Sequence, residues 1–212
     1  MDPWPLRNLV IRTPRLELRP DDDAGLFELV EVAKAGVHAP DKMPFGVPWT
    51  DRPPIEWVKF YWGQRAAFSP DDWSLNFLTR VDGRVVGMQG AVAKDFAVTR
   101  EIHTGSWLGL AHQGKGYGTE MRAAVVMFAF DYLGAERMTS AAHSDNRASH
   151  TVSRKLGYRP DGVERQSIKG KLVFNERLAL TPEQFVRPEW SIEVDGLDGC
   201  RSLLVSEPLG RM

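Results

Sequence analysis

The sequence predicts a mixed α/β protein built around one central sheet. Its first half contains several strand-like segments joined by short turns, and its later part alternates strands with helices. This order is typical of one sheet covered by helices. The composition, with 42% hydrophobic and 26% charged residues, is ordinary for a globular protein.

The first elements follow from local patterns. Residues 11–19 alternate, with Leu16 and Leu18 on one face, which predicts a half-buried strand. Residues 21–23 are acids that cap a helix extending to about residue 35. The segment 36–54 holds five prolines among large apolar side chains, so we expect a loop that either frames a pocket or covers the core. A helix over residues 55–68 follows.

The middle of the chain predicts three strands and a helix. Strands over 73–81 and 84–92 meet at Asp82-Gly83, a strong hairpin signal. A strand over 101–110 leads into a glycine-rich turn. Beyond this turn, apolar residues at helical spacing predict one buried stripe on a helix that ends at Gly134, and these are Met121, Ala124, Val125, Phe128, Ala129 and Tyr132.

The last third predicts a strand over 137–142, a helix capped by Asn146 and closed by Gly157, and a hairpin of residues 162–168 and 172–180. After Thr181, prolines and glycines predict an irregular extension with one short strand near 192–194. We therefore divide the chain into one domain, residues 1–180, and an extension, residues 181–212. The extension either folds back on its own chain or covers a partner subunit, so a homodimer is one expectation.

Charge and composition exclude several classes of protein. The formal net charge of −1 argues against nucleic acid as a primary partner. No apolar run is long enough to span a bilayer, and no secretory signal is visible at the N-terminus. The single cysteine, Cys200, excludes an internal disulfide or a cysteine-rich metal site. We expect a cytoplasmic protein with no membrane segment and no metal.

The glycine-rich turn predicts a phosphate-binding site. Glycines allow a ligand close to the main chain, and free N–H groups at a helix start attract anions. The spacing of Gly114, Gly116 and Gly118 is one residue short of the dinucleotide fingerprint, G-x-G-x-x-G. Residues 109–115 fit most of the nucleoside-triphosphate loop, but Gly116 replaces its essential hydroxyl residue. The remaining alternative is a glycine-rich loop that only joins a strand to a helix.

Residues 113–118 match the pattern Q/R-x-x-G-x-G/A at every fixed position. Here the chain resembles the GNAT superfamily of acyl-CoA-dependent N-acetyltransferases. Residues 105–110 are similar to that family's fourth strand, and residues 146–158 are similar to its next motif. Residues 12–20 resemble the opening strand of the branch that contains ribosomal-protein N-terminal acetyltransferases. The resemblance covers about residues 11–180 and implies a strongly bent mixed sheet flanked by helices.

The resemblance implies an N-acyltransferase. Such an enzyme moves an acetyl group, or another short acyl group such as succinyl, from acyl-CoA to a primary amine by direct attack in a ternary complex. It implies cofactor contacts from Leu108, Leu110, Gln113, Gly114, Lys115, Gly116, Tyr117, Gly118, Thr119, Asn146 and Ser149. Lys115 either adds positive charge to the pyrophosphate site or is an ordinary solvated surface lysine. Asn146 binds the pantetheine arm, caps its helix, or does both.

The catalytic groups depart from the family pattern. Where many members place a tyrosine that protonates the leaving thiolate, this chain has Ser153, with Ser149 one turn earlier as a substitute. Ser153 donates a hydrogen bond to the thiolate or has no proton role. His103 is our candidate for the general base, with Glu101 and His38 as alternatives. A histidine at this place is otherwise a surface residue.

An aromatic pocket is expected for the acceptor. Its walls are predicted from Met43, Phe45, Trp49 and Trp73, and because acids are few, polyamines are disfavoured. A peptide N-terminus and a small-molecule amine both remain open. Two other function classes also remain, a non-catalytic acyl-CoA-binding domain and a nucleotide-binding enzyme. The sequence names neither the acceptor, the acyl group nor the oligomeric state.

Overall fold

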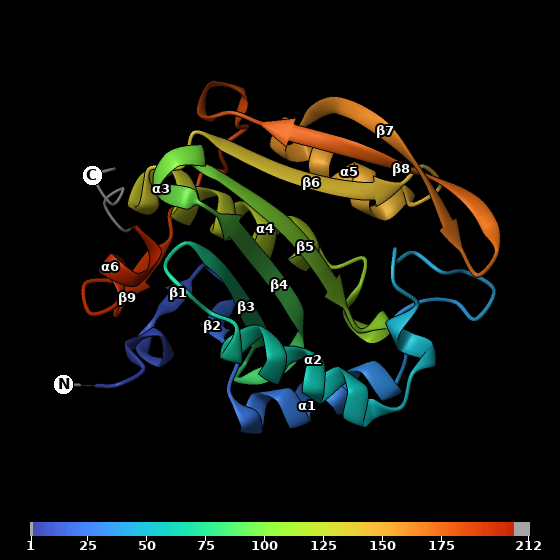
Figure 1. Cartoon of the computed structure of the whole chain (residues 1–212), viewed down its shortest axis with the longest axis horizontal. Coiled ribbons are helices and arrows are strands. Elements are labelled where there is room, and N and C mark those ends of the chain that lie inside the picture. Colours follow the sequence, from blue (N-terminus) through green and yellow to red (C-terminus); the bar gives the residue numbers. More distant parts are fainter. Residues whose placement is uncertain (1, 206–212) are drawn as a thin grey trace.

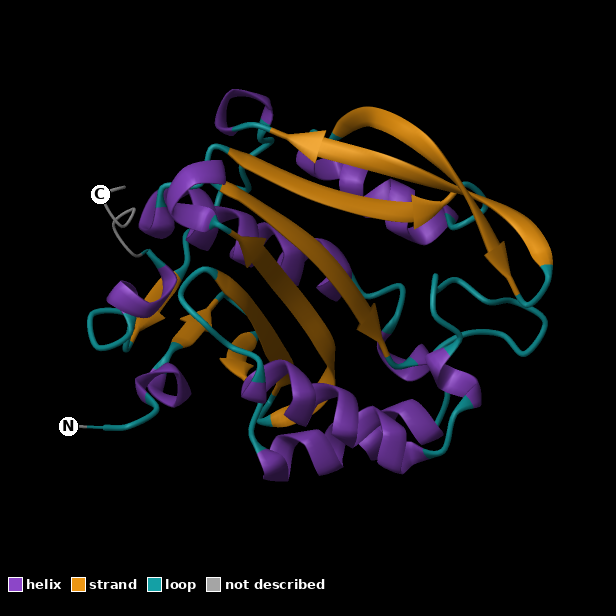
Figure 2. Ribbon diagram, viewed as in Figure 1, coloured by secondary structure: helices purple, strands orange, loops and turns teal. Residues whose placement is uncertain are grey.

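The computed structural model describes residues 2–205, which form a nine-stranded sheet with helices on both faces (Figures 1 and 2). The strand order is β7-β8-β6-β5-β4-β3-β2-β1-β9. Within the described range only β5 and β6 pair in parallel. The strands are β1 Val10–Arg12, β2 Glu17–Pro20, β3 Asp72–Val81, β4 Arg84–Lys94, β5 Glu101–Leu108, β6 Arg137–His143, β7 Arg159–Ile168, β8 Lys171–Leu180 and β9 Glu193–Asp195. The predicted mixed fold is confirmed.

The helices form two layers. The α-helices are α1 Asp23–Lys34, α2 Pro54–Ala66, α3 Phe96–Thr99, α4 Tyr117–Met127, α5 Arg147–Leu156 and α6 Arg201–Leu204. The main core lies between the sheet and α4, and a smaller core lies between the opposite face and α1 with α2. In Figure 1, α1 and α2 cross the lower edge of the view, while α4 runs behind β4 and β5.

Both predicted hairpins are confirmed by their turns. Asp82 and Gly83 have φ values of 48° and 79°, and Lys169 and Gly170 have φ values of 51° and 74°. Two consecutive residues with positive φ make the tight turn that matches the twist of antiparallel strands. Asp22 caps α1 through the Gly25 amide, at the start that the acidic run predicted.

The single strand predicted over residues 11–19 is wrong. The chain reverses there, so β1 and β2 pair antiparallel with Ile11 opposite Leu18. The Thr13 hydroxyl accepts from the Leu16 amide, and the Thr13 amide donates to the Leu16 carbonyl, which closes the turn. Leu16 and Leu18 are still buried, because the alternation resumes with the same phase after the turn.

Helix α4 is buried on all sides. Every residue from 120 to 127 is buried, and the helix continues as a π-helical segment, Phe128–Leu133, that ends at Gly134 with φ 71°. The predicted end is confirmed, but the predicted single apolar stripe describes only one side. The segment after residue 180 covers part of the other side, where Phe185 packs edge-on against Phe130 at 6.0 Å.

The described part of the C-terminal extension folds back on its own chain. Strand β9 pairs with β1 at the edge of the sheet, and Cys200 and Leu204 are fully buried in the main core. Residues 206–212 of the predicted extension lie outside the described part of the chain. Contact of the extension with a partner subunit stays a prediction.

Candidate functional site

The sheet opens between its two parallel strands. Pairing of β5 with β6 runs from Glu101 opposite Arg137 to Thr104 opposite Ser140, although β5 continues to Leu108 and β6 to His143. Beyond Thr104, β5 pairs with β4 and β6 pairs with β8, and Figure 1 shows the two strands diverging. The main chain of β5 therefore lacks its parallel neighbour over residues 105–108.

The glycine-rich turn lies directly after this open stretch. Gly114 and Gly116 have φ values of 75° and 86°, which side chains other than glycine rarely adopt. A Cβ at Gly114 would meet nothing within 4 Å. Gly116 precedes α4, and no side chain of the described residues caps that helix start. The amides of Tyr117 and Gly118 are thus available to an anion, whereas the Thr119 amide donates to the Gly116 carbonyl. Phosphate binding at this turn stays a prediction.

Gln113 holds the turn against the sheet. Its side-chain amide donates to the carbonyls of Val37 and Leu108, each at 2.8 Å. Leu110 uses both of its main-chain groups within the chain, because its amide donates to Gly36 and its carbonyl accepts from Gln113. The main-chain groups of Leu110 are thus already bonded, and so is the Leu108 carbonyl, which accepts from Gln113. The cofactor contacts of Leu108 and Leu110 stay predictions.

An ion pair that sequence reasoning missed supports the turn from the other side. Arg15 bonds to buried Glu120 on α4 through two nitrogens, at 2.5 and 2.7 Å, and donates to the Lys115 carbonyl at 3.1 Å. The same guanidinium lies over the Tyr117 ring, 4.9 Å from its centroid. Arg15 thus links the turn to the helix that follows it. Lys115 is exposed.

Helix α5 brings two predicted residues to the open end of the sheet. Asn146 caps the helix, since its side chain accepts from the Ser149 amide at 3.1 Å. Ser149 is half-buried. Ser153, one turn further, is buried beside α4 and accepts from Arg122 at 3.1 Å. The capping role of Asn146 is confirmed, and the cofactor contacts of Asn146 and Ser149 stay predictions.

Arg122 was not singled out from the sequence, because an arginine in a helix is ordinarily exposed to solvent. Its guanidinium donates to Ser106 of β5 at 3.0 Å, Ser140 of β6 at 3.3 Å and Ser153 of α5 at 3.1 Å. The residue is 4% exposed, and this burial lowers its pKa. The arginine therefore ties three elements together beneath the point where β5 and β6 part.

His103 lies on the opposite face of the sheet. It precedes Thr104, the last residue of β5 that pairs with β6, and its Nδ1 lies 3.2 Å from the Thr139 hydroxyl. The residue is exposed, but the protein atoms around its ring partly desolvate it, which lowers its pKa. The positive charge of Arg122 lowers the pKa further, and Glu101 opposes the shift. Such a shift keeps the imidazole neutral near pH 7, in the form that accepts a proton. Glu101 itself bonds to Arg137.

Aromatic side chains gather on the same face as His103. Trp49 lies 5.1 Å from Trp107 of β5, 5.2 Å from Phe45 and 5.5 Å from Trp57, between ring centroids. Beside them, a Cβ at Gly105 would meet nothing within 4 Å, so this part of the sheet is open. Phe45 and Trp49 thus lie together on this face, and Met43 is half-buried in the same loop. An acceptor pocket walled by these residues stays a prediction.

Trp73 does not belong to this group. It is buried in the main core on the other side of the sheet, edge-on to Phe96 at 5.8 Å. The prediction that Trp73 lines the acceptor pocket is wrong, because its register in β3 turns it towards the α4 side. His38 bonds to Thr50 and to the Ala39 carbonyl, which commits both ring nitrogens.

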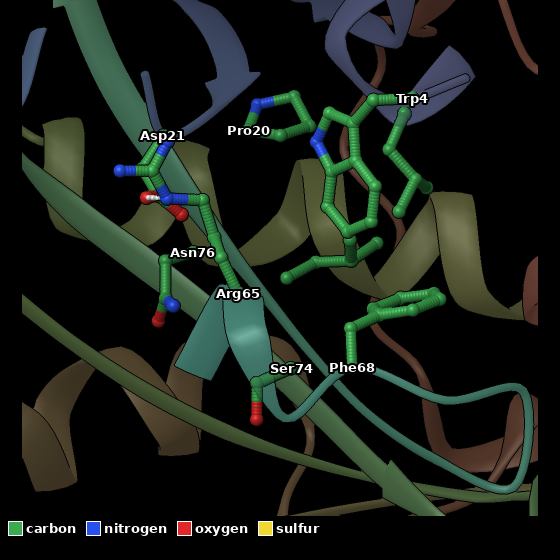
Figure 3. Close-up of a pocket in the computed structure, with 9 residues that line it drawn as sticks. Trp4, Pro20, Asp21, Arg65, Phe68, Ser74 and Asn76 are labelled. Carbon is green, nitrogen blue, oxygen red and sulfur yellow. Dashed lines mark ion pairs between the residues drawn. The ribbon is translucent and has the colours of Figure 1, made fainter. Parts of the chain in front are cut away.

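A small cavity lies elsewhere, beside the end of α2 (Figure 3). Trp4 and Phe68 form its apolar end, and Arg65 reaches across it to Asp21 at 3.0 Å. Burial raises the pKa of Asp21 to about 6, and Arg65 opposes this shift. None of the cofactor or catalytic residues predicted above lines this cavity, so we do not assign it to the site.

Two classes of feature are not found in residues 2–205. No helix there is both long and apolar enough to cross a membrane. No group of three or more His, Cys, Asp or Glu side chains in that range is arranged to hold a metal ion.

Comparisons with known proteins agree with this geometry. The family model described as "Acetyltransferase (GNAT) domain" matches residues 15–159, more than half of the chain. YjcK of Bacillus subtilis (strain 168), a probable N-acetyltransferase, is 26% identical over 110 residues, which are 52% of this chain and 61% of that relative. The chain thus spans less than two thirds of that relative.

Two solved structures share the fold. RimJ of Mycobacterium smegmatis, in complex with CoA-disulfide, superposes with a TM-score of 0.68 at 18% identity, covering 93% of this chain and 95% of that one. RimL, a ribosomal L7/L12 alpha-N-protein acetyltransferase in complex with coenzyme A, gives a TM-score of 0.67 at 19% identity, covering 81% and 97%.

Proposed function

Because this chain belongs to the GNAT acetyltransferase family, we propose that it transfers a short acyl group from acyl-CoA to a primary amine. One observation carries the proposal. The glycine turn, with its uncapped helix start, lies next to the place where β5 and β6 part. The two predicted catalytic side chains, His103 and Ser153, lie on opposite sides of that opening.

The residues present fit the pyrophosphate and pantetheine of acyl-CoA. The space in front of Gly114 is open, and the first amides of α4 have no side-chain acceptor among the described residues. The stretch 105–108 of β5, without a β6 partner, offers an edge to the amides of the arm. The acyl-CoA supplies an activated thioester carbonyl, and the protein orients it.

On the other face, the amine is expected to enter over Gly105, between His103 and the aromatic group around Trp49. His103 accepts the proton that the amine loses as it attacks the carbonyl directly, within a ternary complex. A peptide N-terminus and a small-molecule amine both fit this proposal. The RimL comparison favours testing a peptide N-terminus first.

Ligand-dependent thermal unfolding tests the cofactor. We expect acetyl-CoA or succinyl-CoA at about 100 times its Kd to add roughly 2.7 kcal/mol to the free energy of unfolding, which raises Tm by about 5–10 °C. Gly116→Val, which cannot adopt φ 86° without strain, should lose this increase. A rise with ATP–magnesium or NAD instead of CoA compounds would contradict the proposal and favour a nucleotide-binding enzyme.

Product formation separates an enzyme from a binding domain. Wild-type protein with acetyl-CoA or succinyl-CoA should acylate peptides with a free N-terminus or small amines, measured by mass spectrometry. Binding of CoA without product from any amine would favour the non-catalytic alternative. A homodimer also remains a prediction, and light scattering tests it.

The base is tested by the pH dependence of turnover. His103→Ala should lower kcat at neutral pH by about 100-fold or more, within the range of general base catalysis, and remove the acidic limb of the profile. The Tm increase with acyl-CoA should be unchanged. Lys94→Ala, an exposed change near the far end of β4, serves as the matched control. An unaltered pH–rate profile in His103→Ala would exclude this histidine from the mechanism.

A further inference from the structure

Arg122 carries a buried charge without a buried counter-charge. No ion pair joins it to an acidic side chain within residues 2–205, and its Nε atom has no hydrogen-bond partner there. Burying an uncompensated cation costs several kcal/mol, and hydrogen bonds to neutral hydroxyls offset only part of this. A charge kept under these conditions implies negative charge arriving from a ligand or developing during a reaction.

The three serines around the guanidinium are not equivalent. Each oxygen accepts from Arg122, so each hydroxyl retains its own proton to donate. Ser140 donates to the Thr104 carbonyl. Ser106 and Ser153 have no acceptor among the described residues. Ser153 is thus a buried hydroxyl that accepts one hydrogen bond from a cation and whose own proton has no acceptor among the described residues.

The place of this hydroxyl fits the leaving group. Ser140 is the last residue of β6 that pairs with β5, and Ser106 lies two residues beyond Thr104 on β5, so the cluster spans the opening. Ser106 and Ser140 hold the guanidinium on the two strands, and Ser153 reaches it from α5. The arrangement is rigid, because Arg122 bonds to all three elements.

We propose that Arg122 is a positioning residue that orients and polarises the Ser153 hydroxyl towards the sulfur of acyl-CoA. This role rests on the proposed function. The amine nitrogen forms the new bond to the carbonyl carbon, the C–S bond breaks, and its electron pair stays on sulfur. Ser153 keeps its proton and stabilises the thiolate by a hydrogen bond that the adjacent cation strengthens. The amine proton passes to His103, and solvent protonates the thiolate after release.

The test is a double-mutant cycle on a protein that has first been shown to acylate an amine. Arg122→Met and Ser153→Ala should each lower kcat by about 10- to 100-fold, with KM for acyl-CoA changed by less than about threefold, because the interaction strengthens in the transition state. The kcat of the double variant should lie within about twofold of the kcat of the less active single variant, because both substitutions remove the same hydrogen bond. Arg122→Lys should restore part of the lost rate.

Stability distinguishes this role from a structural one. Replacing an unpaired buried charge with an apolar side chain of similar length is neutral or stabilising, so Tm of Arg122→Met should equal or exceed that of the wild type. Arg84→Met, an exposed change at the β3–β4 turn, serves as the control for the substitution itself.

Several outcomes would overturn the role. One is a lower Tm with unchanged kcat in Arg122→Met, and another is two rate losses that multiply in the double variant. If Arg122→Met does not fold, two other variants test the role. The role is excluded if Ser153→Ala has the kcat of the wild type and the double variant Arg122→Lys/Ser153→Ala is also fully active. Wild-type protein that acylates no amine would overturn the proposed function and this role together, whereas the other outcomes leave the function intact.

Discussion

Two regions of this molecule bury charge, and they do so differently. On the α4 side of the sheet, Arg122 is bonded to three serines and forms no ion pair within the described chain. At the end of α2, Arg65 bonds to Asp21, which is 7% exposed, and also to Asp23 at the surface. The second region gives its buried charge a partner of opposite sign, and the first does not.

This difference separates a structural cluster from a functional candidate. In the Arg65–Asp21 pair, the opposite charge offsets part of the desolvation cost of the buried carboxylate, so no ligand charge is required. A buried cation without a partner is stabilised only when negative charge is present, and Arg122 lies where the sheet opens. The small cavity in Figure 3 adjoins the Arg65–Asp21 pair, so in this protein the presence of a cavity does not mark the predicted chemistry.

The largest expected effect comes from breaking the pair between Arg65 and Asp21. Arg65→Met leaves the Asp21 carboxylate buried without its partner, so we expect the free energy of unfolding at pH 8 to fall by about 3 kcal/mol. Urea denaturation measures this change. For Arg122→Met we expect the free energy of unfolding to stay the same or to rise. Equal losses of stability in Arg65→Met and Arg122→Met would show that the two regions do not differ.

An effect of about the same size follows from the pKa of Asp21. Its folded-state pKa, about 6, lies above the ordinary 3.8, so the folded protein binds the proton more tightly than the unfolded chain. This contribution to stability is full below about pH 3.8 and is lost as the pH rises through about 6. We expect the loss to be about 3 kcal/mol, and Asp21→Asn should remove it. Urea denaturation in a pH series measures it; a dependence unchanged in Asp21→Asn would assign it to another group.

The smallest effect concerns the ion pair between Arg15 and Glu120, in which only one partner is buried. Arg15 is half exposed and Glu120 is buried, and together they hold the glycine turn to α4. Arg15→Met should weaken binding of acetyl-CoA by about tenfold, corresponding to about 1.4 kcal/mol, through a less ordered turn. Calorimetric titration measures the affinity. Arg12→Met, which breaks exposed pairs at the sheet edge, is the control, and an equal loss there would contradict a specific role for Arg15.

Local chemistry let the sequence alone determine much of this protein. The hairpin turns at Asp82-Gly83 and Lys169-Gly170, the caps Asp22 and Asn146, and the glycine turn before α4 all depend on residues near one another in the chain. The same holds for the family pattern over residues 113–118. These features were predictable because the residues within each turn or helix end themselves favour its backbone conformation.

Only the tertiary structure decided the rest, because it depends on segments far apart in sequence. Whether Trp73 faces the acceptor or the core is set by the register of β3 against β4, and a shift of one residue reverses every side chain. The Leu110 amide is occupied by the Gly36 carbonyl from a distant part of the chain, since the loop after α1 closes on the end of β5. The helical pattern alone places Arg122 at the edge of the apolar stripe, next to Ala129, where a long charged side chain can reach solvent. It is buried because β5, β6 and α5 pack around it, and only this packing brings its three serines together.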